Sequence, residues 1–202
     1  MKILLTGFEP FGGESINPAL ESVKRLHRQT IAGAEVISLE LPVTWDGAMP
    51  KVAAAIAELS PDVVISVGQA GSRAKVTPEY IGINVMNGKD NAGVEKRDQR
   101  IDPNGPDGHF STLPVLQMVA AMQAADIPAA VSYTAGTYLC NFLAYSVPHY
   151  IAANNLPIKA GFIHIPYLPQ QVHNKPAGTP SLPLETIVAG LRECIKGIAE
   201  QA

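Results

Sequence analysis

The chain has 202 residues, of which 47% are hydrophobic and 16% are charged, and its formal net charge is −3. A chain of this length can enclose a sizeable apolar core without metals or disulfides, and it lacks the surplus of Lys and Arg that binding to phosphates needs. We therefore expect one domain over residues 1–202 and no nucleic acid partner.

The amino-terminal segment is not typical of a secreted or membrane protein. Its apolar run, Ile3 to Leu5, is too short for the apolar part of a secretory signal, and no later segment reaches membrane-spanning length. We expect a cytoplasmic protein that does not enter a membrane. Because thiols stay reduced there, a disulfide between Cys140 and Cys194 is not expected, and each thiol needs its own explanation.

Short apolar segments rich in β-branched or aromatic residues predict five buried strands. They cover residues 2–8, 34–41, 63–68, 129–135 and 160–166. Helical patterns alternate with them, at residues 18–28, 47–59, 114–125, 140–154 and 181–200. The first helix has Asn17 as its cap and Pro18 in its first turn. This alternation predicts a single-domain three-layer α/β/α sandwich around a twisted, largely parallel sheet.

Residues 77–114 break the alternation. They allow a strand at 81–85 and then become charged and rich in turn residues. Loops of this length are uncommon inside domains and are often lids or binding loops. For the charged run "EKRDQRID" (95–102) we favour a solvated loop tip over a ligand-binding role.

Cys140 is a candidate nucleophile because of its predicted place between a strand and a helix. Ligands of open α/β sheets gather at the carboxyl ends of strands. A thiol at a helix amino terminus faces unpaired N–H groups and the positive end of the helix dipole, which lower its pKa, and those N–H groups could hold an oxyanion. Free cysteines are also among the most buried residues, so position alone leaves a core cysteine open.

His164 is the candidate base for this thiol. The segment "FIHIP" places it near the carboxyl end of the last predicted strand, on the same edge as Cys140. A thiolate and an imidazole at neighbouring strand ends suit attack on an acyl carbon. Glu79 follows the end of another strand and could orient the imidazole. The alternatives are a core histidine bonded to the backbone and an exposed loop carboxylate.

Five segments resemble the pyroglutamyl peptidase I family of cysteine peptidases, in the family's order and at similar spacing. They are "LLTGFEPFGGESINP", "VGQAG", "TPE" followed by "IN", "SYTAGTYLCN" and "FIHIPYLPQQ". The resemblance covers Ile3 to about Gln171. It implies an enzyme that removes an amino-terminal pyroglutamyl residue from peptides through a thioester, with Cys140 as nucleophile, His164 as general base and acid, and Glu79 as the residue that orients His164.

The resemblance also implies an α/β/α fold, no metal or organic cofactor, a cytosolic location and a homotetramer. Because pyroglutamate is a flat, uncharged lactam, its pocket is expected to be aromatic with few polar contacts. Phe8 and Phe11 resemble the family's ring-binding phenylalanines, with packing on the first helix as the alternative. Tyr138 and Leu139 take the positions of an aromatic and an aliphatic pocket residue.

Two polar residues complete the expected pocket. Gln69 resembles a polar contact near the active site, since its amide offers both a donor and an acceptor. Asn17 is expected to brace its loop as well as cap the first helix. A free amino terminus would leave its charge unpaired in such a pocket, so ordinary peptides should be rejected.

The chain departs from the family pattern at three positions that bear on pocket detail, substrate range and rate. Tyr80 replaces the Arg that usually follows the Glu of "TPE", and Phe142 replaces the His of "CNH". After "IN" the chain has "VMNGKDN" where the family often has "xxARIPDN", and Lys89 could replace that arginine without its planar fork. Cys194, at apolar spacing in the last predicted helix, is expected in the core.

Two other classes of function stay open. A turn such as "GQAGSR" (68–73) after a strand can cradle phosphate, as in nucleoside phosphorylases. A phosphorylase-like or nucleoside-processing enzyme would need phosphate and survive thiol alkylation. A non-catalytic binding homologue would bind substrate without turnover.

Overall fold

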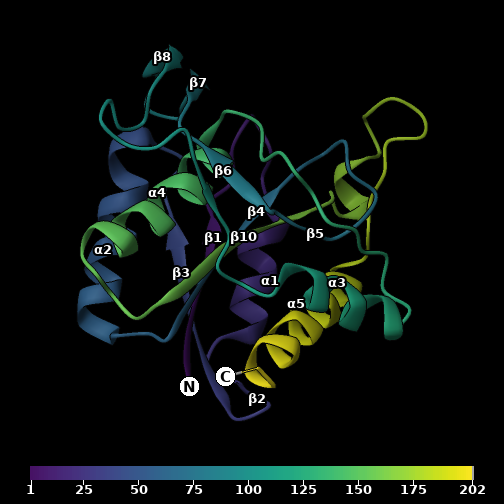
Figure 1. The fold of residues 1–202 in the computed structure, drawn as a ribbon. Helices are drawn as coiled ribbons and strands as arrows, with labels where there is room; N and C mark the ends of the chain where they lie inside the picture. The colour runs from purple at the N-terminus through teal and green to yellow at the C-terminus, as the bar shows by residue number, and fades with distance from the viewer. Residues whose placement is uncertain (202) are drawn as a thin grey trace.

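The computed structural model describes residues 1–201, and a mixed six-stranded sheet lies at its centre (Figure 1). Across the sheet the order is β2-β3-β1-β4-β10-β5. The parallel strands are β1 (Lys2–Phe8), β3 (Ala34–Leu41), β4 (Val63–Gln69) and β10 (Lys159–Ile165). The short antiparallel strands β2 (Thr30–Ile31) and β5 (Thr77–Pro78) pair with β3 and β10.

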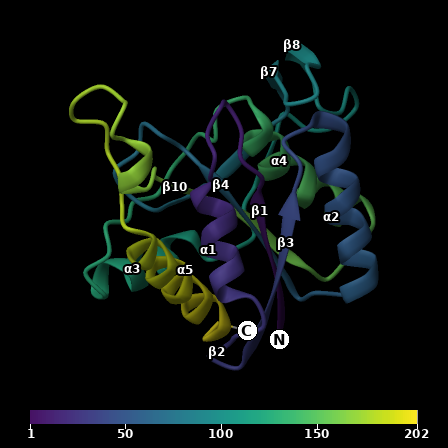
Figure 2. The same ribbon diagram turned by 180° about the vertical axis from the view of Figure 1, so that it is seen from behind.

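Helices cover both faces of the sheet, as the two opposite views show (Figures 1 and 2). One layer holds α1 (Pro18–Leu26), α3 (Val115–Ala124) and α5 (Leu184–Ala199), and the other holds α2 (Trp45–Leu59) and α4 (Leu139–Ala153). Side chains of β1 alternate between two apolar cores: Ile3 and Leu5 pack toward α1 and α5, whereas Leu4 and Phe8 pack toward α2 and α4. The predicted three-layer α/β/α sandwich with a largely parallel sheet is confirmed.

The helix boundaries follow local chemistry. The Asn17 side chain accepts a hydrogen bond from the backbone N–H of Ala19 at 3.0 Å, and Pro18 occupies the first turn, so α1 begins where the sequence predicts. The last helix begins later than predicted, at Leu184, because Pro183 immediately precedes it. Within residues 1–201, no helix has both the length and the apolar composition needed to cross a bilayer.

The predicted strand at 129–135 is wrong as a continuous strand. The segment forms only isolated parallel bridges, from Ala129 to Val76 and from Ser132 to Glu79. Its partner segment contains Pro78, which has no N–H to donate, so a regular ladder cannot form. The segment still lies along the edge of the sheet and leads into α4.

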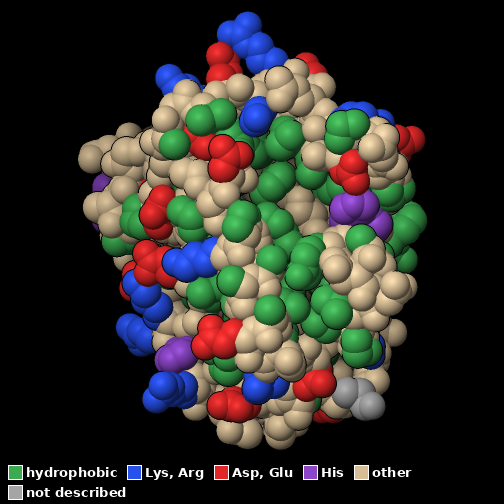
Figure 3. Space-filling view, turned by 90° about the vertical axis from the view of Figure 1, so that its left-hand side faces the viewer, with side chains coloured by type: hydrophobic (Ala, Val, Ile, Leu, Met, Phe, Trp, Pro, Cys, Tyr) green, Lys and Arg blue, Asp and Glu red, His purple; other side chains and the backbone are tan. Residues whose placement is uncertain are grey.

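Residues 77–114 contain more structure than the sequence predicts. The expected strand at 81–85 is present as β6 (Ile81–Ile83), which pairs with β9 (Gly108–Phe110). Between them, β7 (Met86–Lys89) and β8 (Glu95–Gln99) form a hairpin. Most of β8 is exposed, and charged side chains stand at the tip of the molecule in Figure 3. The charged run is therefore solvated, as expected, but its residues 95–99 form a strand of a hairpin and not an irregular loop tip.

Candidate active site

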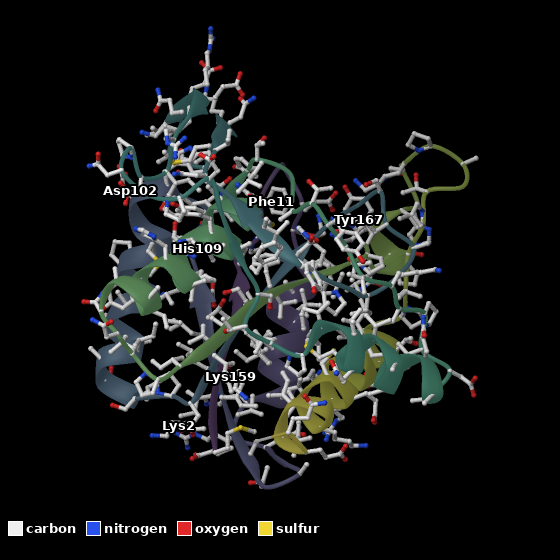
Figure 4. All side chains as sticks on the ribbon, viewed as in Figure 1. Lys2, Phe11, Asp102, His109, Lys159 and Tyr167 are labelled. Atoms are coloured by element: carbon white, nitrogen blue, oxygen red, sulfur yellow. The ribbon has the colours of Figure 1, made fainter. Side chains whose placement is uncertain are left out.

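A cavity of about 240 Å³ opens at the carboxyl ends of β1, β4 and β10. Figure 4 shows Phe11 and Tyr167 at this end of the sheet, far from Lys2 and Lys159, where β1 and β10 begin. The cavity brings together eight predicted site residues, which are Phe8, Phe11, Asn17, Gln69, Tyr138, Leu139, Cys140 and His164. Its other lining residues are Val43, Ala135, Gly136 and Thr137.

Cys140 is the second residue of α4, close to the carboxyl ends of two strands. A Cβ atom added to Gly68 in β4 would lie 2.7 Å from the Cys140 sulfur. Gly68 is also the residue that pairs with His164 in the parallel ladder between β4 and β10. Paired residues of neighbouring strands point to the same face of a sheet. The sulfur and the imidazole therefore lie on the same face, over adjacent strands.

The helix start leaves donors available near this sulfur. The N-cap residue Tyr138 makes no side-chain capping bond, and the first helical backbone bond is donated by Phe142 to the Tyr138 carbonyl. The N–H groups of the first turn have no partner inside an α-helix. They supply the kind of donors that hold a developing oxyanion.

Glu79 contacts the imidazole from a third segment. Its Oε1 atom lies 2.6 Å from His164 Nδ1, and both side chains are buried. The Glu79 backbone N–H donates to the Phe162 carbonyl on β10 at 2.8 Å, which fixes the carboxylate beside this strand. Because a carboxylate accepts, Nδ1 carries the proton and Nε2 is left as the basic nitrogen.

Arg73 is a site residue that the sequence patterns did not assign. Its Nη1 donates to Glu79 Oε1 at 2.6 Å and also to the Thr77 hydroxyl, while Nη2 donates to the Thr134 carbonyl at 2.8 Å. Glu79 is 1% exposed, and burying an unpaired carboxylate is costly. A buried glutamate therefore needs a cationic partner. Arg73 lies six residues earlier, in the "GQAGSR" turn, and this short separation could have predicted the pair from the sequence.

Burial dominates the ionisation of both candidate reactive groups. It raises the pKa of the Cys140 thiol to about 12, with Glu79 acting in the same direction and Arg73 opposing. The expected lowering by the helix terminus is thus wrong for this state, because desolvation outweighs it. Burial also lowers the pKa of His164, although the hydrogen bond to Glu79 opposes this. Both pKa shifts favour the uncharged form of the group, the thiol of Cys140 and the imidazole of His164.

The walls of the cavity are largely apolar. Tyr138 donates from its hydroxyl to the Lys89 carbonyl at 2.8 Å, and its ring meets Trp45 edge-on at 5.4 Å. The Phe142 ring also meets Trp45 edge-on, at 5.8 Å, and does not line the cavity. Lys89 contributes its backbone to the support of Tyr138, and its side chain does not line the cavity. Tyr80 lies elsewhere, in an aromatic surface cluster with Phe110 and Tyr133.

The polar lining residues are held by the protein. Asn17 donates from its amide to the Glu9 carbonyl at 3.0 Å in addition to capping α1, so it braces the loop between β1 and α1. Gln69 accepts a hydrogen bond from the Gln171 amide at 2.9 Å. Both cysteines are free thiols, and Cys194 lies in the core, as expected. Within residues 1–201 no three His, Cys, Asp or Glu side chains form a group that could hold a metal ion.

Comparison with known proteins identifies relatives of the whole chain. The family model described as "Pyroglutamyl peptidase" matches residues 1–201. The pyrrolidone-carboxylate peptidase of Treponema denticola is 47% identical over 99% of this chain and 94% of the relative. That of Levilactobacillus brevis is 50% identical over 98% of this chain and 97% of the relative.

Solved structures agree with these relatives. Pyroglutamyl peptidase I of Bacillus amyloliquefaciens has a TM-score of 0.95 at 40% identity, covering 98% of this chain and 97% of that one. A mutant pyrrolidone carboxyl peptidase of Pyrococcus furiosus has a TM-score of 0.96 at 36% identity, covering 100% and 99%. The fold and the relatives define a cysteine-type peptidase, which is a hydrolase. The chain belongs to the pyroglutamyl peptidase family.

Proposed function

We propose that this protein hydrolyses the amide bond after an amino-terminal pyroglutamyl residue of peptides, using Cys140, His164 and Glu79. The observation that carries the proposal is the cavity in which Cys140 and His164 meet an aromatic wall. A flat, uncharged lactam ring fits between such side chains, and a peptide with a charged amino terminus would find no counter-charge there.

The geometry supports a two-step acyl transfer. His164 Nε2 takes the proton from the Cys140 thiol as the sulfur attacks the pyroglutamyl carbonyl carbon. The backbone N–H groups at the start of α4 hold the resulting oxyanion. The protonated imidazole then donates its proton to the leaving amine, the C–N bond breaks, and a thioester remains.

Water completes the cycle. His164 removes a proton from a water molecule that attacks the thioester, the C–S bond breaks, and the proton returns to the sulfur. Glu79 keeps the imidazole in the tautomer that both steps need, because it accepts the hydrogen bond from Nδ1.

The "GQAGSR" turn offers little support for the phosphorylase-like alternative. Arg73 of this turn is bonded to Glu79, and the Tyr167 ring packs so closely on Gly71 that a Cβ there would lie 2.1 Å from a ring carbon. Neither feature suits a turn that cradles phosphate through its backbone and a free cation.

Release of a fluorophore from pyroglutamyl aminomethylcoumarin tests the proposal. We expect turnover in phosphate-free buffer, loss of turnover after treatment with iodoacetamide, and no release from the prolyl analogue. A requirement for phosphate would support the phosphorylase alternative, and binding without turnover would support a non-catalytic homologue.

The same proposal includes the setting in which the enzyme works. We infer a single domain over residues 1–202 that acts without a cofactor in the cytoplasm, as a homotetramer. Light scattering after size-exclusion chromatography measures the mass in solution, and a mass of one 21.4 kDa chain would contradict the tetramer.

A further inference from the structure

Gln171 is a buried polar residue outside the cavity that contacts the cavity lining. It ends the short helix η1 (Pro169–Gln171), which follows β10, and it is 7% exposed. Its Oε1 atom accepts from the backbone N–H of Leu168 at 2.9 Å. Its Nε2 atom donates to Gln69 Oε1 at 2.9 Å, to the Ile16 carbonyl at 3.3 Å and to Glu14 Oε2 at 3.4 Å.

These partners leave only one orientation for the Gln171 amide. A backbone N–H can only donate, so the Gln171 atom that faces Leu168 must be the oxygen. A backbone carbonyl can only accept, so the atom that faces Ile16 must be the nitrogen. Both ends of the side chain are therefore fixed by groups whose own roles cannot reverse.

The fixed orientation of Gln171 determines the orientation of Gln69. The Gln69 atom that faces the Gln171 nitrogen has to accept, so it is the oxygen, and the Gln69 nitrogen is left on the other side. Within residues 1–201 this nitrogen makes no hydrogen bond, and it is not among the fully enclosed polar atoms that lack a partner. Gln69 lines the cavity, so its side-chain nitrogen is available there as a hydrogen-bond donor.

We propose that Gln171 is a positioning residue for specificity: it holds the Gln69 amide so that the cavity presents a donor to the lactam carbonyl of a pyroglutamyl substrate. This inference rests on the proposed function. Two other polar side chains of the lining are held by the protein, since Asn17 bonds to Ala19 and Glu9, and Tyr138 bonds to Lys89. The Gln69 amide keeps its oxygen on Gln171, which leaves its nitrogen to recognise the ring carbonyl.

Substitution by Glu and by Met separates this role from simple packing. In Q171E both side-chain oxygens accept, so the Gln69 amide turns to donate toward residue 171 and presents its oxygen to the cavity. In Q171M the Gln69 amide loses its partner but can still turn its nitrogen toward the substrate. We expect kcat/KM for pyroglutamyl aminomethylcoumarin to fall about 3- to 10-fold in Q171M and about 100-fold in Q171E, mainly through KM.

The same pair of substitutions in a Q69M background is the matched control. If Gln171 acts through Gln69, the Q69M/Q171E and Q69M/Q171M proteins should agree within about threefold. Repulsion between Glu14 and a new carboxylate at position 171 would persist in that background, as would any loss of packing. Thermal unfolding of each variant, followed by circular dichroism, checks that the proteins are folded.

The outcomes distinguish the inference from the proposed function. Two results would overturn the inference alone, provided that the wild type turns over. One is a Q171E variant at least as active as Q171M. The other is a difference in kcat/KM between Q171E and Q171M that stays as large in the Q69M background. Absence of wild-type turnover overturns the proposed function and this ligand assignment with it. If Q171E fails to fold, the Q69E variant tests the inference instead. In Q69E, Gln171 still donates to one carboxylate oxygen of residue 69, and the other oxygen faces the cavity, where a donor is needed. A kcat/KM of Q69E at least as high as that of Q69M overturns the inference.

Discussion

The charges of Arg73 and Glu79 offset one another beneath the candidate reactive pair. Glu79 raises the pKa of Cys140 and Arg73 lowers it, although burial remains the largest influence. The carboxylate can therefore orient His164 while the guanidinium limits its repulsion of a thiolate. The pairing of these two side chains is a condition for placing a carboxylate in such a buried site.

Replacement of Arg73 should change the ionisation of the thiol. In Arg73→Met, the loss of a nearby positive charge should raise the pKa of Cys140, so alkylation by iodoacetamide should require a higher pH. We expect kcat/KM to fall about 10- to 100-fold, with partial recovery in Arg73→Lys, which restores the charge but not the fork. An alkylation profile identical to that of the wild type would show that Arg73 does not act on the sulfur.

The proposed triad predicts an order among its own variants. Cys140→Ala and His164→Ala should each lower kcat by about a thousandfold or more, because each removes a group that takes part in bond making or proton transfer. Glu79→Gln should lower kcat less, because the amide oxygen of the new glutamine can still accept the hydrogen bond from His164 Nδ1. Steady-state turnover measures the order, with unfolding temperatures as the control. A kcat lower in Glu79→Gln than in Cys140→Ala would contradict the predicted order.

At the residue scale, the sequence predicted the residues that line the cavity better than the residues that hold them in place. Eight predicted residues line it because a resemblance at the level of motifs carries whole segments. Arg73 lies in the segment "GQAGSR" and Gln171 in "FIHIPYLPQQ", but the contacts of both side chains join distant parts of the chain. Hydrogen bonds such as that from Gln171 to Gln69, 102 residues apart, depend on how loops fold over the sheet, which no local pattern records.

At the element scale, the close approach of α4 to β4 depends on Gly68, because glycine has no side chain. Gly68 lets the Cys140 sulfur and the Phe162 ring lie directly over the strand, since a Cβ would be 2.7 Å from each. Contacts so short cannot be accommodated without moving the sulfur, the ring or the helix. Gly68 therefore fixes how close the Cys140 sulfur, the proposed nucleophile, lies to β4, the strand whose Gly68 pairs with His164.

The substitution Gly68→Ala should damage activity more than folding. Overpacking of this kind costs about 1–3 kcal/mol of stability, while displacement of the sulfur should lower kcat at least about 100-fold. Gly197→Ala in α5 is the matched control, since the nearest atom to its new Cβ is 3.8 Å away. Chemical denaturation and turnover are measured on both. Normal kcat in Gly68→Ala would show that the sulfur does not depend on this close approach.

Long periodic elements were predictable from the sequence, and short ones were not. In the described part of the chain, the four parallel strands and five α-helices follow from apolar runs and from caps such as Asn17. Strands such as β5 and β9 have two or three residues and owe their existence to tertiary pairing. The segment at 129–135 shows the reverse case, in which a strand-like composition meets a proline in its partner and pairs only at isolated bridges.

At the scale of the whole molecule, several groups make stability depend on pH in one direction. Burial lowers the pKa of His164 and of His109 below the ordinary 6.5, so the unfolded chain binds these protons first. Hydrogen bonds lower the pKa of Asp102, from the Asn104 backbone, and of Glu14, from Lys175. All four groups bind more protons in the unfolded state than in the folded state. The contribution of each group to the free energy of unfolding is therefore lost as pH falls.

Thermal unfolding should record this dependence. We expect the midpoint temperature to fall as pH is lowered from about 7.5 to about 5.5, where the two histidines titrate in the unfolded chain, and to fall further near pH 4, where the carboxylates titrate. A His109→Asn variant should show a shallower slope in the first range only. A midpoint that rises toward pH 5.5 would contradict the burial of neutral histidines.

The most direct measurement is mass spectrometry of the enzyme quenched with acid during turnover of a pyroglutamyl peptide. We expect one added pyroglutamyl group, carried by the proteolytic fragment that contains Cys140 and absent in Cys140→Ala. An acyl group on any other residue, or rapid turnover by a Cys140→Ala protein, would contradict it.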